Sequence, residues 1–103
     1  MTVEPGTILD FWKALGTEGQ FRRNDAVDRE IAEKFGETYE AAVRGELDGW
    51  RNAPDSCLAL IIVLDQFSRN LFRDDPRAFA HDADARTVAR EAIAAGFYQK
   101  VED

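Results

Sequence analysis

Hydrophobic residues recur at the three- and four-residue spacing of amphipathic helices through most of the chain. A first helix is predicted from a capping-box pattern at Thr7 to Gly16, and a second from a cap at Asn24 or Asp25 to Gly45. The second helix also carries acid-first i,i+4 pairs, which are typical of a solvated face. Its apolar stripe comprises Val27, Ile31, Phe35 and Ala42 or Val43.

The most apolar stretch, CLALIIVL at residues 57–64, fits either a buried strand or a helix when it is taken alone. Its helical stripe continues beyond the stretch on both sides, which a strand of period two would not produce. The sequence therefore predicts a helix from about Pro54 to Leu71. Because the first half is apolar on all sides, we expect this helix to be central and contacted from several directions. The stripe comprises Cys57, Leu60, Ile61, Leu64, Phe67 and Leu71.

The remaining segments are also predicted to be helices or connectors. Residues 46–54 indicate a short helical turn with Leu47 and Trp50 as core anchors, and residues 73–79 indicate a connector. A last helix is predicted from a cap at Asp82 to Gly96. No segment has a strand-pairing pattern, so we expect a single all-α domain of short antiparallel helices over residues 1–103.

Charge and composition narrow the function classes. The net charge of the 103 residues is −7 and no run of Lys or Arg offsets it, so we expect no nucleic-acid partner and no membrane partner. Cys57 is the only cysteine, and its apolar neighbours predict a buried thiol without a disulfide. The apolar runs are far shorter than the roughly 20 residues of a membrane span, and the first residues lack a signal-peptide pattern. These observations predict a soluble cytoplasmic protein.

Five polar side chains gather on one face of the predicted central helix, directly after its most apolar part. They are Asp65, Gln66, Arg69, Asn70 and Arg73. One interpretation is structural: Asp65 and Arg69 form an i,i+4 ion pair, while the others bind a helix end or a neighbouring helix. The other is functional: two guanidiniums, a carboxylate and two amides recognise a carboxylate or phosphate group. The sequence leaves both interpretations open.

Patterns for catalysis or metal binding are sparse elsewhere. His81 is the only histidine, and the spacing in HDAD at residues 81–84 does not match a standard metal site. There is no phosphate-binding loop, nucleophile elbow or Cys/His pair, and we predict no metal and no cofactor. An acid–base pair stays open because 20 acidic residues offer too many combinations, so no catalytic residue is assigned. Trp12 and His81 are retained as candidate ligand-binding residues beside the five polar ones.

Four stretches resemble the bacterial family of uncharacterised proteins known as domain of unknown function 924 (DUF924). They are ILDFW (8–12), FGETYEAAVRGELDGW (35–50), LALIIVLDQFSRNLFR (58–73) and PRAFAHDADA (76–85). The resemblance implies an all-helical, tetratricopeptide-like right-handed stack, and it implies no established activity. Ser68 stands where the family usually has proline, and Gln20 where an aromatic residue is usual. Family members continue into further helices, so the chain resembles a short or truncated form.

Two function classes follow from these observations. The first is a helical scaffold that binds a protein or peptide, because stacked helices present concave faces and the chain lacks a catalytic set. The alternative is a small-molecule binder or enzyme that recognises an anionic metabolite through the five polar residues. Arginines paired with a neighbouring helix would favour the scaffold, and arginines open to a pocket would favour the metabolite.

A homodimer is also expected. The predicted central helix is apolar nearly all round, and a short chain offers few other helices to cover it. The residues expected at or near the interface are Ile62, Val63, Val88 and Ile93.

Overall fold

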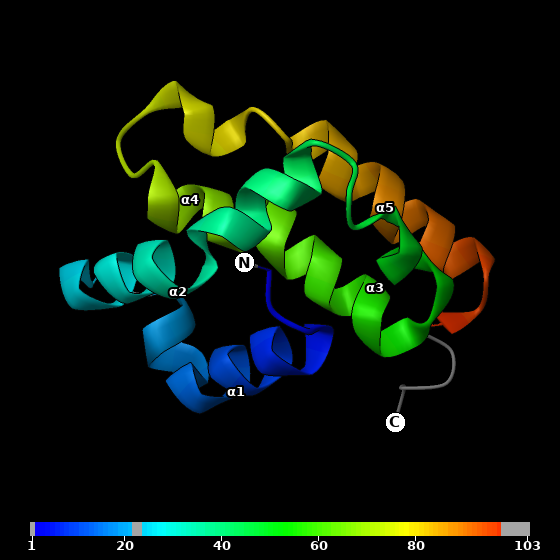
Figure 1. Ribbon diagram of the computed structural model, residues 1–103, viewed down its shortest axis with the longest axis horizontal. Coiled ribbons are helices and arrows are strands. Elements are labelled where there is room, and N and C mark those ends of the chain that lie inside the picture. Colours follow the sequence, from blue (N-terminus) through cyan, green and yellow to red (C-terminus); the bar gives the residue numbers. More distant parts are fainter. Residues whose placement is uncertain (1, 22–23, 98–103) are drawn as a thin grey trace.

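The computed structural model describes residues 2–21 and 24–97, with the side chains of 2–16 and 24–97. Every regular element in these ranges is helical, so the predicted all-α class is confirmed (Figure 1). The tetratricopeptide-like stacking stays a prediction. The elements are α1 (Pro5–Phe21), α2 (Asp25–Val43), η1 (Asp48–Asn52), α3 (Pro54–Ile61), the π-helical η2 (Ile62–Phe67), α4 (Ser68–Leu71), η3 (Pro76–Phe79) and α5 (Asp82–Ala94).

Helix α2 has the ends that the sequence predicts. The Asn24 side chain accepts hydrogen bonds from the backbone N–H groups of Ala26 at 2.9 Å and Val27 at 3.2 Å, so Asn24 is the N-cap. The helix ends at Val43, and Gly45 follows with a φ of 82°, the left-handed conformation that commonly stops a helix.

Helix α1 extends beyond its predicted limits. It begins at Pro5, and the N–H of Thr7 already donates to the carbonyl of Glu4 at 3.0 Å, so the predicted cap at Thr7 is wrong. At Gly16, with φ 67° and ψ 178°, the first helical segment ends as predicted, and a second helical segment continues across a kink to Phe21. Only glycine adopts this backbone region readily, so the residue type explains where the break lies.

The predicted central helix is present from Pro54 to Leu71 as the uninterrupted run of α3, η2 and α4. Its π-helical middle, η2, is a feature that the sequence did not predict. A π-helical turn holds more residues than an α-helical turn, so the extra residue rotates everything that follows by roughly 100°. The hydroxyl of buried Ser68 donates to the carbonyl of Leu64 at 2.6 Å just beyond this point.

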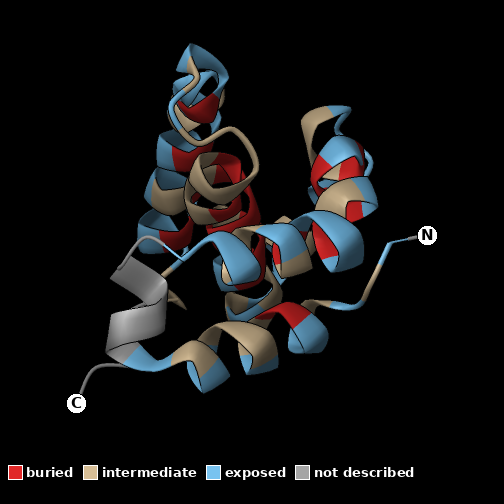
Figure 2. Ribbon diagram, turned by 90° about the vertical axis from the view of Figure 1, so that its left-hand side faces the viewer, coloured by how far each residue is buried: buried red, intermediate tan, exposed pale blue. Residues whose placement is uncertain are grey.

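The central helix lies between two hydrophobic cores and contributes to both. On one side it packs against α1, and on the other α3 packs against α5 and η1 (Figure 1). The first core comprises Ala59, Ile62, Val63 and Phe67 with Ile8, Ile31, Phe35 and Tyr39. The second comprises Cys57, Leu60 and Leu64 with Ala41, Leu47, Ala85, Val88 and Ala92. Figure 2 shows buried residues along the inward sides of the helices, and the predicted central position is confirmed.

Most of the residues expected at a dimer interface lie inside this single chain. Ile62, Val63 and Val88 are buried, because α1, α2 and α5 cover the central helix more completely than the length of the chain suggested. That part of the prediction is wrong. Ile93 is 60% exposed and remains accessible. The homodimer itself stays a prediction.

The structure confirms two predictions about apolar residues, namely the buried thiol and the core anchors. The Cys57 thiol is buried, with its Sγ atom 3.9 Å from the carbonyl oxygen of Val88, as its apolar neighbours predict. Leu47 is buried and Trp50 packs against both cores, so both act as core anchors. Within residues 2–21 and 24–97, no helix combines the length and the apolar character needed to cross a bilayer.

Candidate functional site

The predicted ion pair on the central helix is formed. An Nη1 atom of Arg69 in α4 lies 2.7 Å from Oδ1 of Asp65 in η2 and also donates to the Asp65 carbonyl at 3.0 Å. The amide of Gln66 donates to the other carboxylate oxygen of Asp65. These three side chains are therefore joined in one local network on a single helix.

Arg69 also connects the central helix to α5. Its Nη2 atom lies 3.4 Å from Oδ2 of Asp82, the first residue of that helix. The prediction that Asp82 caps α5 is wrong, since His81 occupies the cap position and neither residue makes a side-chain cap hydrogen bond. Asp82 instead shares the guanidinium of Arg69 with Asp65.

Arg73 and Asn70 bind a different helix. The Arg73 guanidinium contacts both carboxylate oxygens of Asp28 in α2, at 2.6 and 2.8 Å, and the Asn70 amide donates to Oδ1 of Asp28 at 2.8 Å. The hydrogen bond with Asp28 raises the pKa of Arg73 above its usual value, and Asp25 and Asp74 add to this effect, while burial opposes it. A bidentate arginine–carboxylate pair of this kind fixes both distance and orientation.

The structure thus divides the five predicted polar residues into two groups. Arg69 joins Asp65, which also binds Gln66, to Asp82 of α5, whereas Asn70 and Arg73 bind Asp28 of α2. The sequence did not identify Asp28 as the partner of Arg73. Asp28 lies 45 residues away, and an acidic residue in the first turn of a helix is too common to indicate a specific partner.

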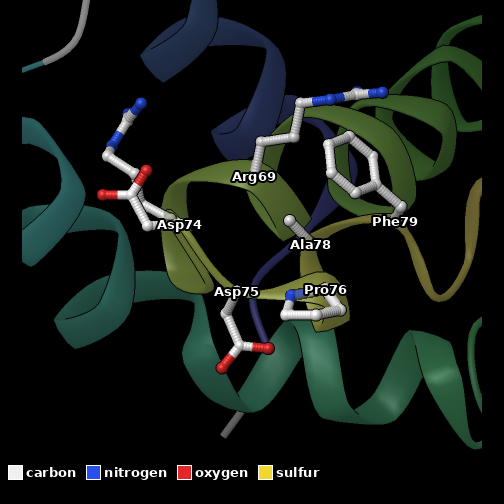
Figure 3. A pocket seen from close by; sticks show the side chains of 7 residues that line it. Arg69, Asp74, Asp75, Pro76, Ala78 and Phe79 are labelled. Atoms are coloured by element: carbon white, nitrogen blue, oxygen red, sulfur yellow. The ribbon is translucent and has the colours of Figure 1, made fainter.

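A pocket of about 590 Å³ opens beside these contacts, between the end of α4 and η3 (Figure 3). Phe79 is 58% exposed at this pocket, and the guanidinium carbon of Arg69 lies 5.2 Å from the centroid of its ring. The loop that forms one side passes through Asp74, whose φ of 65° is unusual for a residue other than glycine. The lining residues are Arg69, Arg73, Asp74, Asp75, Pro76, Ala78 and Phe79.

The loop at this pocket is held by its own contacts. Asp75 caps η3, because its Oδ1 atom accepts from the N–H of Arg77 at 2.8 Å, and its Oδ2 atom pairs with the Arg77 guanidinium at 3.0 Å. This pairing lowers the pKa of Asp75 and raises that of Arg77. The Arg77 guanidinium also lies 4.8 Å from the centroid of the Phe72 ring.

Of the predicted site residues, Arg69 and Arg73 line the pocket, whereas Asp65, Gln66, Asn70, Trp12 and His81 do not. Trp12 is half-buried in α1 and meets the buried ring of Phe67 edge to face, with 6.0 Å between the ring centroids. His81 pairs through Nδ1 with Asp84 at 3.1 Å and lies with its ring 6.1 Å from that of Tyr39. In the described ranges, no three His, Cys, Asp or Glu residues are grouped so that they could hold a metal ion.

Comparison with known proteins identifies the family of this chain. The chain matches the family described as "Bacterial protein of unknown function (DUF924)" over residues 8–103. It therefore belongs to the DUF924 family, as the resemblance in its sequence implies. No protein with curated annotation matches it.

One solved structure is very similar to this fold. It is the protein of unknown function ATU0120 from Agrobacterium tumefaciens, at 41% sequence identity and a TM-score of 0.91. The match covers 96% of this chain and 56% of that chain, so this chain spans little more than half the length of its relative.

Proposed function

We propose that this protein is a helical binding module, and that a segment of another protein docks at the pocket between α4 and η3. The observation that carries this proposal is the combination at one site of an open pocket, an exposed aromatic ring and arginines already engaged by carboxylates of the same chain.

The two function classes differ in whether the arginines are paired with carboxylates of the same chain or open to a ligand. Arg73 is bound through Nε and Nη2 to Asp28 on a neighbouring helix, and Arg69 is bound through Nη1 to Asp65 and through Nη2 to Asp82. An anionic metabolite would have to compete with these carboxylates for the same N–H groups, and it would meet their negative charge at close range. The arrangement therefore favours the scaffold over the metabolite binder.

The pocket offers the features of a protein-binding site instead. Its volume of about 590 Å³ suits one large side chain and its neighbours, and Phe79 presents an aromatic surface at its edge. Aromatic residues in a pocket are typical centres of binding energy, and arginine stacked on the ring extends the flat contact surface. Pro76, which is exposed, adds apolar surface without a long mobile side chain.

The proposal is tested with peptides selected from a displayed random library against the intact protein. The affinities of the selected peptides are measured by fluorescence anisotropy for the wild type, for Phe79→Ala and for the control Ile93→Ala, which removes a similarly exposed apolar side chain from α5. Loss of a central aromatic residue should weaken binding by about 30-fold or more, and the control should bind almost normally. Peptides that bind both variants as tightly as the wild type would refute the proposal.

A separate measurement addresses the anionic metabolite. The melting temperature is followed with inorganic phosphate and with citrate, and no specific stabilisation is expected because the arginines are engaged. Stabilisation by either anion that disappears in Arg69→Gln would favour the metabolite binder instead.

A further inference from the structure

We infer that the segment that docks at this pocket is basic, with an apolar side chain placed beside Phe79 and lysine or arginine residues next to it. The inference rests on the proposed function, because it specifies the partner of the same pocket. It follows from the charges that surround the pocket.

The lining itself is balanced, with Arg69 and Arg73 against Asp74 and Asp75, but carboxylates outnumber guanidiniums once their ion-pair partners are included. Those that line it, or that bind a residue of the loop or of α4 beside it, are Asp28, Asp65, Asp74, Asp75 and Asp82, against Arg69, Arg73 and Arg77. The chain as a whole carries a net charge of −7. A concave site with this balance attracts cationic groups and repels anionic ones.

The ion pairs within the chain do not neutralise every carboxylate beside the pocket. Arg69 serves Asp65 and Asp82 together, and the Oδ1 atom of Asp82 is buried without a hydrogen-bond partner among the residues that the structure describes. Because one guanidinium serves two carboxylates, this part of the network keeps a net negative charge beside the pocket, which favours a cationic partner.

Phe79 gives such a segment a place to bind. Arg69 lies over the ring at 5.2 Å from its centroid, yet the residue remains 58% exposed. The exposed part can accept both an apolar side chain and a cation, since the faces of aromatic rings attract lysine and arginine. Charge and aromatic surface thus favour the same partner.

The test uses three labelled peptides that share a central tryptophan flanked by lysines, by serines or by glutamates. Their affinities are measured for the wild type, for Asp74→Asn and for Asp55→Asn. Asparagine has nearly the size of Asp74 and tolerates its positive φ, so the substitution removes the charge with little strain on the backbone. Asp55, in the first turn of α3, lies 14 residues before Arg69 on the same helix and is the matched charge control.

The lysine peptide should bind most tightly, and Asp74→Asn should weaken it by about two- to fivefold while Asp55→Asn leaves it unchanged. Added salt should weaken the same complex most. If the three peptides bind equally well and all depend on Phe79, the inference of a basic partner is wrong and the docking site stands. If none of the three peptides binds, and no selected peptide depends on Phe79, both the inference of a basic partner and the proposed docking site are wrong. A dimer in sedimentation that Phe79→Ala dissociates would mean that a second copy covers the pocket, and it would also overturn the inference.

Discussion

The ion pair between Arg73 and Asp28 should contribute more to stability than the pair between Arg69 and Asp65. The first joins the turn after α4 to α2 through two contacts of 2.6 and 2.8 Å, and its side chains are 26% and 15% exposed. The second lies within one helical run, and its side chains are 38% and 29% exposed. Solvent screens the second pair more, and its partners are already close in sequence.

Exposed ion pairs are typically worth about 0.2–1 kcal/mol, whereas breaking a fully buried pair costs about 3–5 kcal/mol. Since the Arg73–Asp28 pair is bidentate and mostly shielded, we expect a coupling energy of about 1–2 kcal/mol. For Arg69–Asp65 we expect about 0.5 kcal/mol, close to other i,i+4 pairs.

Double-mutant cycles measure both couplings by urea denaturation. One cycle combines Asp28→Asn with Arg73→Gln, and the other combines Asp65→Asn with Arg69→Gln. The cycle cancels the separate effect of Asp28 on the start of α2. A coupling near zero for the first pair, or a larger coupling for the second, would refute the argument from burial and geometry.

The remaining predictions concern single residues. Burial raises the pKa of the Cys57 thiol, so its contribution to stability is complete below the pKa of the unfolded thiol and is lost as the pH rises above it. The free energy of unfolding should therefore fall between about pH 8 and pH 10 in the wild type, and by less in Cys57→Ala; equal falls would contradict the burial effect. Gly16→Ala should destabilise the protein by at least about 1 kcal/mol, because its φ of 67° disfavours a side chain. Gly36→Ala should stabilise it by about 0.5–1 kcal/mol, since the added methyl group meets open space in α2, and thermal melts of the two variants should shift in opposite directions.

The sequence predicted the helices well where a single residue decides the local structure. Asn24 caps α2, Gly45 follows its end, and Gly96 with a φ of 80° follows the end of α5. The central helix was identified by the phase of its apolar stripe, which is a property of many residues together. Gly16 ends the first helical segment of α1 as predicted, but the second segment, which continues across the kink to Phe21, was not predicted.

The candidate site was predicted only in part. The pair of Asp65 and Arg69 follows from spacing along one helix. The partner of Arg73 does not, because Asp28 lies on another helix and any of several acidic residues in α2 had the same local pattern. The π-helical turn has no residue signature in this segment, and the pocket depends on the path of the loop through Asp74. Both are set by packing between elements that are distant in sequence.

The position of the central helix between two cores has a consequence for folding. Ile62 and Val63 pack with α1 and α2, while Leu60 and Leu64 pack with α5, although all four lie within two turns of one helix. Neither core can unfold without exposing the residues that the central helix contributes to the other core. The two cores should therefore unfold together as one cooperative unit instead of as two separate foldons. A destabilising substitution in the core beside α1 would then also destabilise the contacts of α5. The amide hydrogens of the central helix would exchange only when the whole domain unfolds.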